Sequence, residues 1–136
     1  MEEVLISGLK RSDFQTSIKG KQTDLFVLKN NEGVEVCITN YGGAIMAIMV
    51  PDREGRMANI IQGHDSIEKL INSPEPFLST LVGRYANRIN QGRITVEGVE
   101  YQLPQNNYGH CLHGGPNGFQ YAVFDVEEAD ERSLTL

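Results

Sequence analysis

The chain has 136 residues, about one domain's worth, of which 40% are hydrophobic and 22% charged. This composition is typical of a globular protein and excludes collagen, coiled coils and low-complexity disorder. Eighteen acidic against twelve basic residues give a formal charge of −6, which argues against binding of a nucleic-acid backbone. The longest apolar run, residues 44–50, is too short for a membrane-spanning helix, so no membrane partner is expected.

The N-terminus and the cysteines indicate the cellular compartment. Glu2 and Glu3 stand where a secretory signal would carry positive charge, and no apolar stretch follows them. Cys37 and Cys111 each stand among apolar residues, which is typical of small buried side chains and not of a disulfide framework. We therefore expect a cytoplasmic protein with both thiols free.

Apolar and polar residues alternate along most of the chain, which is the two-residue period of β-strands. One helix is expected at residues 66–72, with Ser66 as its N-cap and Pro74 beyond its end. The expected strands, bounded by turn residues, cover residues 24–29, 34–39, 44–50, 58–62, 92–103 (a hairpin), 120–127 and 133–136.

Strands at intervals of about ten residues, with turns between them, predict an all-β fold, an antiparallel sandwich or barrel. We expect a single domain over residues 1–136. The strand pattern continues to Leu136, and a strand at a terminus leaves an open edge. The sandwich is therefore expected to be incomplete, with an open sheet edge available for self-association or for a complementing chain.

Two arginines and an asparagine stand close together in residues 83–89, in an otherwise apolar neighbourhood. The guanidinium groups of Arg84 and Arg88 offer donors in a fixed fork, and Asn87 offers both a donor and an acceptor. That combination suits the neighbouring hydroxyls of a sugar. The same residues also fit a structural role, in which one arginine pairs with a carboxylate and the other caps a turn.

Residues 106–119 are rich in glycine and asparagine and predict a loop, the usual place for a functional site. Adjacent glycines in this loop would let the backbone approach a ligand closely. His113 beside them can exchange a proton near neutral pH, but a loop histidine also fits a purely hydrogen-bonding role. The spacing of His110, Cys111 and His113 matches no four-ligand zinc pattern, so no metal is expected.

Five short motifs occur in a characteristic order: NYGG at 40–43, VPDREG at 50–55, VGRYANRI at 82–89, YQL at 101–103 and LHGGPNGF at 112–119. Together they resemble the N-terminal part of the aldose 1-epimerase (galactose mutarotase) family. The resemblance implies the large β-sandwich of that family and a cytoplasmic isomerase that needs no cofactor. It also implies that Arg88 binds the sugar with Asn87 beside it, and that His113 is both a substrate-binding and a catalytic residue, whereas Arg84 is structural.

The implied reaction is interconversion of the α and β anomers of a hexose such as galactose or glucose, through acid–base ring opening. In the family the general acid is a second histidine and the base is a glutamate, both well downstream of the LHGG motif. Neither is expected in this chain, so we expect it to be inactive by itself. Two alternatives remain open, a non-catalytic sugar-binding module and a structural fragment that assembles with another chain.

Overall fold

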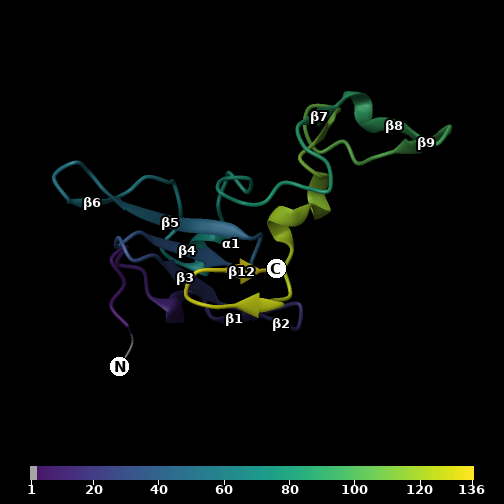
Figure 1. Cartoon of the computed structure of the whole chain (residues 1–136). Coiled ribbons are helices and arrows are strands. Elements are labelled where there is room, and N and C mark those ends of the chain that lie inside the picture. The colour runs from purple at the N-terminus through teal and green to yellow at the C-terminus, as the bar shows by residue number, and fades with distance from the viewer. Residues whose placement is uncertain (1–2) are drawn as a thin grey trace.

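Four antiparallel strands form the largest sheet of the computed structural model, which describes residues 3–136. In spatial order they are β3 (Leu25–Lys29), β4 (Glu35–Thr39), β5 (Ala44–Pro51) and β6 (Met57–Asn59), each hydrogen-bonded to the next (Figure 1). Strands adjacent in the chain are therefore adjacent in the sheet, as short hairpin connections require. The expected all-β, antiparallel class is confirmed.

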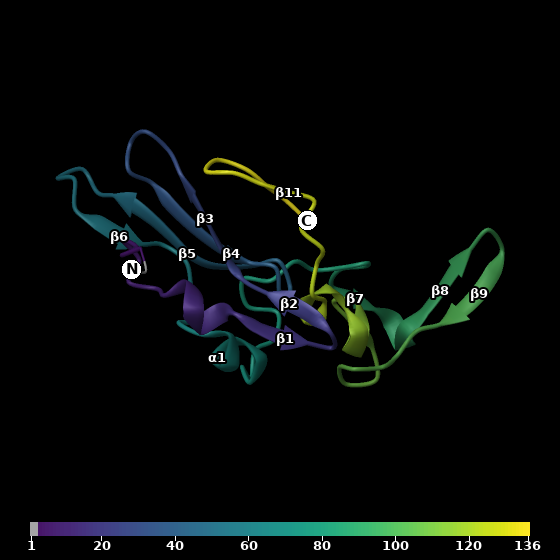
Figure 2. The ribbon, with the colours of Figure 1, turned by 90° about the horizontal axis from the view of Figure 1, so that it is seen from below.

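The other strands form separate two-stranded antiparallel sheets. They are β1 (Thr16–Ile18) with β2 (Lys21–Thr23), β7 (Arg88–Ile89) with β10 (Cys111–Leu112), β8 (Arg93–Val96) with β9 (Val99–Gln102), and β11 (Glu128–Ala129) with β12 (Leu134–Thr135). The helical segments are α1 (Ile67–Ile71) and the 3₁₀ turns η1 (Arg11–Phe14), η2 (Asn90–Gly92), η3 (Gly115–Asn117) and η4 (Phe119–Tyr121). Figure 1 and Figure 2, in perpendicular views, show the β8–β9 hairpin projecting away from the four-stranded sheet. Within residues 3–136, no helix is long and apolar enough to cross a membrane.

The core packs against one face of the four-stranded sheet, on the side where η1 and α1 lie (Figure 2). Phe14 from η1, Leu70 from α1 and Met46 from β5 are almost fully buried there. Burying side chains of this size stabilises a fold by about 1.5–3 kcal/mol each. Cys37 of β4 belongs to the same cluster, and both cysteines are buried and free, as predicted.

Most of the expected elements are present. The hairpin of residues 24–39 forms β3 and β4, and that of 92–103 forms β8 and β9. The helix begins after Ser66, whose Oγ accepts the backbone N–H of Lys69 at 3.3 Å, a standard N-cap contact. The end of the chain forms β12, which pairs with β11.

Some of the expected strands differ from those observed. The strand expected at 44–50 ends at the proline as expected but includes it: Pro51 is the last residue of β5, at a point where β6 alone flanks the strand and a missing N–H is tolerated. The strand expected at 58–62 is instead Met57–Asn59. The strand expected at 120–127 is absent: its first residues belong to η4, and Val123 makes only an isolated bridge with Tyr41. There the backbone bonds to the Tyr41 turn, through Gly42 N–H to the Ala122 carbonyl at 2.7 Å.

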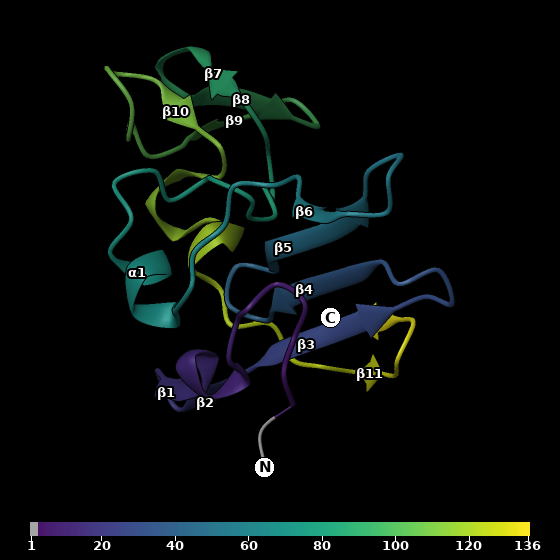
Figure 3. The same ribbon diagram turned by 90° about the vertical axis from the view of Figure 1, so that its left-hand side faces the viewer.

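A buried carboxylate holds the N-terminal segment, which crosses the four-stranded sheet in Figure 3. Glu35, the first residue of β4, is fully buried and accepts the backbone N–H groups of Ser7 at 3.0 Å and Ile6 at 3.1 Å. Lys29 lies 3.7 Å away. Burial by itself would raise the pKa of Glu35, but the hydrogen bonds and the Lys29 charge outweigh it and hold the pKa below its usual value.

Glu35→Gln should lower the free energy of unfolding by about 2–3 kcal/mol at pH 7, because it replaces charge-assisted hydrogen bonds with weaker ones. The folded-state pKa of Glu35 is depressed, so its stabilisation is present above the unfolded pKa and is lost as the pH falls through the folded pKa. The gap between wild type and variant in urea unfolding should therefore shrink in acid. The exposed Glu32→Gln serves as control, with a change below about 0.5 kcal/mol. A gap that stays constant with pH would contradict this assignment.

Candidate functional site

A two-residue ladder brings the two candidate stretches together. Strands β7 and β10 are antiparallel, with Arg88 opposite Leu112 and Ile89 opposite Cys111. Because the strands run in opposite directions, the residue before Arg88 lies beside the residue after Leu112. Asn87 and His113, 26 positions apart in the chain, are therefore neighbours.

His113 is bound to the main chain of Asn87 in two ways. Its Nδ1 accepts the Asn87 backbone N–H at 2.9 Å, and its own backbone N–H donates to the Asn87 carbonyl at 3.1 Å. Both residues have left-handed backbones, with φ of 48° for His113 and 56° for Asn87, and asparagine and histidine are among the residues that adopt this conformation most readily. A neutral imidazole whose Nδ1 accepts a hydrogen bond carries its proton on Nε2. The site therefore presents His113 as a donor through Nε2.

Phe77 supports the imidazole from the side. Its ring centroid lies 4.9 Å from that of His113, with the two planes tilted by 59°. Tilted ring contacts of this kind are favourable and limit rotation of both rings. The bond from Asn87 to Nδ1 and the ring contact with Phe77 together fix the orientation of the imidazole.

Arg88 is exposed, and only one edge of its guanidinium is held. Its Nε donates to Asn107 Oδ1 at 3.1 Å, and its backbone N–H donates to Asn87 Oδ1 at 2.9 Å. None of the ion pairs within residues 3–136 involves Arg88. The carboxylate partner of the structural alternative is therefore absent from that part of the chain, and the terminal nitrogens can donate to a ligand.

Arg84 has a different environment. Its guanidinium carbon lies 5.6 Å from the centre of the Phe119 ring, which is the distance of a cation–π contact. Phe119 in turn packs edge-on against Phe124, with centroids 5.5 Å apart. Arg84 thus packs on one ring of an aromatic pair.

Gly114, the first of the adjacent glycines, lies against the backbone of Gly83. A side chain at Gly114, where φ is +86°, would place its Cβ 2.1 Å from the carbonyl oxygen of Gly83. The same oxygen accepts the Phe119 backbone N–H at 3.0 Å. The Cβ direction of Gly114 is therefore filled by the backbone of the arginine-bearing stretch, while Gly83, Arg84 and Gly114 also line a hollow of about 410 Å³.

The histidines and Cys111 do not form a metal site. No three His, Cys, Asp or Glu side chains within residues 3–136 are grouped so as to hold a metal ion. The Nδ1 atoms of His110 and His113 accept backbone N–H groups instead. Cys111 is buried on the ladder beside Tyr85, and burial together with a hydrogen bond to this thiol raises the pKa of Tyr85.

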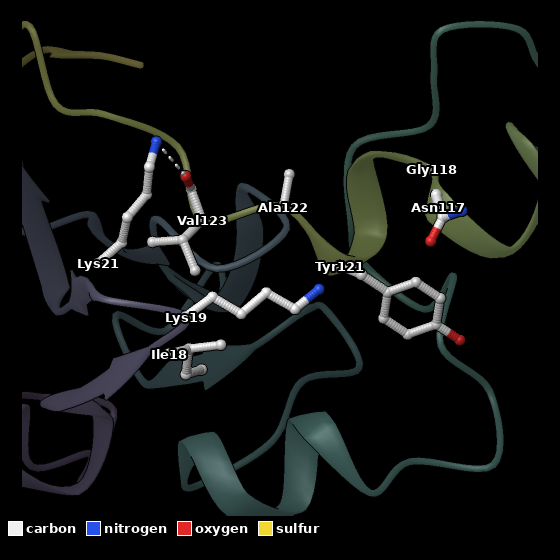
Figure 4. Close-up of a pocket in the computed structure, with 8 residues that line it drawn as sticks. All are labelled: Ile18, Lys19, Lys21, Asn117, Gly118, Tyr121, Ala122 and Val123. Atoms are coloured by element: carbon white, nitrogen blue, oxygen red, sulfur yellow. Dashed lines mark hydrogen bonds between the residues drawn. The ribbon is translucent and has the colours of Figure 1, made fainter.

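A hollow of about 340 Å³ lies on another side of the glycine-rich loop (Figure 4). It is enclosed by the β1–β2 turn and by residues at and after Asn117. Lys21 closes one end, donating to the Val123 carbonyl at 3.4 Å and to Asp125 at 2.9 Å. The residues that line this hollow include neither Arg88 nor His113, so it is not the predicted sugar site.

The structure adds two residues that sequence reasoning did not assign to the site, Asn107 and Phe77. Asn107 precedes Tyr108 and Gly109, a pair with positive φ that is typical of tight hairpin turns. That turn signal was visible in the sequence. The contacts of Asn107 with Arg88 and of Phe77 with His113 were not, because they depend on the β7–β10 ladder.

Known proteins of one family match most of this chain. The sequence model of the aldose 1-epimerase family matches residues 24–136. Galactose mutarotase of Rattus norvegicus is 38% identical over 105 residues, which are 77% of this chain and 30% of that protein. That of Bos taurus is 39% identical over 99 residues, 73% of this chain and 28% of that protein. The chain thus spans about 30% of the length of the curated relatives it matches.

Solved structures give the same result. The GalM/aldose epimerase homologue from C. elegans superposes with a TM-score of 0.78 at 28% identity, over 82% of this chain and 34% of that one. Galactose 1-epimerase from Lactobacillus acidophilus NCFM superposes with a TM-score of 0.70, also at 28% identity, over 85% of this chain and 33% of that one. The arrangement of strands is therefore shared with these proteins.

Gly114→Ala should lower the free energy of unfolding by about 2–4 kcal/mol, because a Cβ combines a backbone clash with an unfavourable φ. Gly98→Ala is the matched control: Gly98 has φ +81°, but no atom lies within 4 Å of the place that its Cβ would occupy, so the change should cost only about 1 kcal/mol. Urea unfolding of the two variants gives both values. Equal losses would mean that the approach of Gly114 to Gly83 is not a constraint.

Proposed function

Because the chain belongs to the aldose 1-epimerase family, we propose that it forms one wall of a hexose-binding cleft in which the α and β anomers of an aldose such as galactose or glucose are interconverted. On this wall Arg88 and Asn87 bind sugar hydroxyls, and His113 donates to a sugar oxygen. The observation that carries the proposal is the meeting of these three residues across the β7–β10 ladder.

The groups available on this wall are mostly donors. The terminal nitrogens of Arg88 lie beyond its contact with Asn107, which uses Nε. The Oδ1 of Asn87 accepts the Arg88 backbone N–H, which leaves its Nδ2 for a ligand. His113 adds its Nε2–H. A hexose presents several hydroxyl oxygens and a ring oxygen as acceptors, so the wall complements a sugar without requiring a charged substrate.

Ring opening assigns a role to the His113 proton. Conversion of one anomer into the other removes a proton from the C1 hydroxyl and delivers one to the ring oxygen, after which the C1–C2 bond rotates and the ring closes again. Both groups must be within hydrogen-bond reach of their protons. His113 already carries its proton on Nε2, so it can donate to a sugar oxygen that gains negative charge, but it cannot accept the C1 proton there. The base must therefore approach from the opposite side of the sugar.

Galactose should bind this chain weakly, in the millimolar range, without faster exchange between its anomers. Binding follows from the donor set, and the absence of exchange follows from the lack of a base on this wall. A two-dimensional proton exchange spectrum measures both: line broadening reports binding, and cross-peaks between anomeric protons report turnover. Unchanged line widths at saturating sugar would contradict the sugar-binding wall. Cross-peaks above the spontaneous rate would contradict the assignment of the base to another part of the cleft.

Arg88→Ala should raise the galactose Kd by about tenfold or more, because a hydrogen bond to a charged group contributes about 1.5–3 kcal/mol. Arg84→Ala is the control: it removes a cation–π contact, at a cost in stability of about 0.5–1 kcal/mol, and should change Kd by less than about twofold. Titration followed by sugar line broadening measures both variants. If Arg84→Ala is the damaging change in a folded protein, the sugar-binding arginine has been misidentified.

A further inference from the structure

Residues 107–110 form a tight turn directly before β10. The backbone N–H of Asn107 donates to the His110 carbonyl at 3.0 Å, and that of His110 donates back to the Asn107 carbonyl at 2.8 Å. Between them Tyr108 and Gly109 both have positive φ, 47° and 79°, as in the commonest two-residue hairpin loop. The side chains of the two end residues both reach across to the arginine-bearing strand.

These two side chains bind the segment 88–91, one at Arg88 and the other at Gln91. Asn107 Oδ1 accepts the Nε–H of Arg88 at 3.1 Å, and His110 Nδ1 accepts the backbone N–H of Gln91 at 3.0 Å. Gln91 has a left-handed backbone with φ 52°, in the 3₁₀ turn that follows β7. The turn is thus attached to the far end of this segment by His110 and to the guanidinium by Asn107.

We propose that His110 is a positioning residue for Arg88. The bond from Gln91 to His110 fixes the 107–110 turn against the arginine-bearing strand. The fixed turn then places Asn107 Oδ1 where it accepts the Nε–H of Arg88. This inference rests on the proposed function only in that Arg88 contacts the sugar. His110 is assigned no contact with the sugar in this proposal.

The outer part of the turn has little else to hold it. Tyr108 is 95% exposed, and nothing lies within 4 Å of a side chain built at Gly109. Asn106 braces the turn through two bonds with Leu112, at 2.8 and 3.0 Å, but those join it to its own strand, β10. From residues 107–110, the side-chain contacts to the segment at Arg88 are those of Asn107 and His110. The carbonyl of Gln91 also accepts the side-chain amides of Gln102 at 2.8 Å and Gln105 at 2.9 Å, whereas its N–H donates to His110.

The same contact occurs twice at this site. His113 Nδ1 accepts the N–H of Asn87, and His110 Nδ1 accepts that of Gln91, and both donors have left-handed backbones. The two histidines thus hold the segment from 87 to 91 at both of its ends. Each neutral ring is thereby fixed with its proton on Nε2. Because Arg88 lies between the two points of attachment, its backbone is held on both sides.

The acceptor atom can be tested with a matched pair of variants. An asparagine side chain places its Oδ1 close to the position of a histidine Nδ1, whereas glutamine places its oxygen about one bond further out, close to Nε2. His110→Asn therefore retains the acceptor for Gln91, and His110→Gln removes it while keeping a polar amide of larger size. If only the size or the polarity of residue 110 mattered, His110→Gln, the larger amide, would not be more damaging than His110→Asn.

The experiment measures hydrogen exchange of the Gln91 amide and of the Arg88 Nε–H in the isotope-labelled chain, with near-ultraviolet circular dichroism to establish that each variant is folded. His110→Gln should speed both exchanges by about fivefold, the equivalent of one neutral hydrogen bond, and His110→Asn should restore them toward wild type. A long-range proton–nitrogen spectrum of the wild type should show His110 and His113 protonated on Nε2. Exchange of Arg88 Nε–H that is the same in wild type and His110→Gln would overturn the proposal, as would a His110 ring protonated on Nδ1.

Galactose titration separates this inference from the proposed function. In a chain that binds galactose, His110→Gln should raise Kd by about fivefold and His110→Asn by less than about twofold. Equal weakening by both variants would overturn the positioning role. If the wild-type chain does not bind galactose, the proposed function fails, while the effect of His110 on the Arg88 Nε–H exchange still decides whether His110 positions the guanidinium.

Discussion

The candidate site depends on one small constraint, the antiparallel pairing of β7 with β10. Only two residues of each strand take part, yet the pairing joins stretches that are more than twenty positions apart and puts Asn87 beside His113. So short a ladder has few hydrogen bonds of its own. It is reinforced on one side by the close approach of Gly114 to the Gly83 carbonyl, and on the other by contacts from the 107–110 turn. Close backbone approach and side-chain hydrogen bonds to the main chain therefore reinforce the ladder.

This construction explains why the chemistry of His113 is specified by the main chain. A carboxylate partner at Nδ1 would stabilise a charged imidazole, whereas a backbone N–H can only be accepted by a neutral ring. With Nδ1 used as the acceptor of this contact, the imidazole carries its proton on Nε2. In the proposed function, this arrangement lets Nε2 donate to a sugar oxygen.

Sequence reasoning succeeded where the signal was periodic. The alternation in residues 24–39 and 92–103 gave both hairpins, and Ser66 gave the start of the helix. It failed for β7 and β10, since two residues carry no detectable period, and for residues 120–127, where alternation was present but the backbone bonds to the Tyr41 turn. Arg88, Asn87 and His113 could be nominated from motifs. Their supporting residues could not, because Asn107 and Phe77 contact them only through the folded loops.

The left-handed residues of the site have a consequence for how its sequence can evolve. Of the seven non-glycine residues with positive φ within residues 3–136, four lie here: Asn87, Gln91, Tyr108 and His113. β-Branched side chains are strongly disfavoured in this conformation, and most others are strained. The set of amino acids admissible at these positions is therefore narrowed by the backbone before any ligand selects among them. An asparagine or histidine at these positions is therefore favoured by the backbone conformation, independently of any ligand that its side chain contacts.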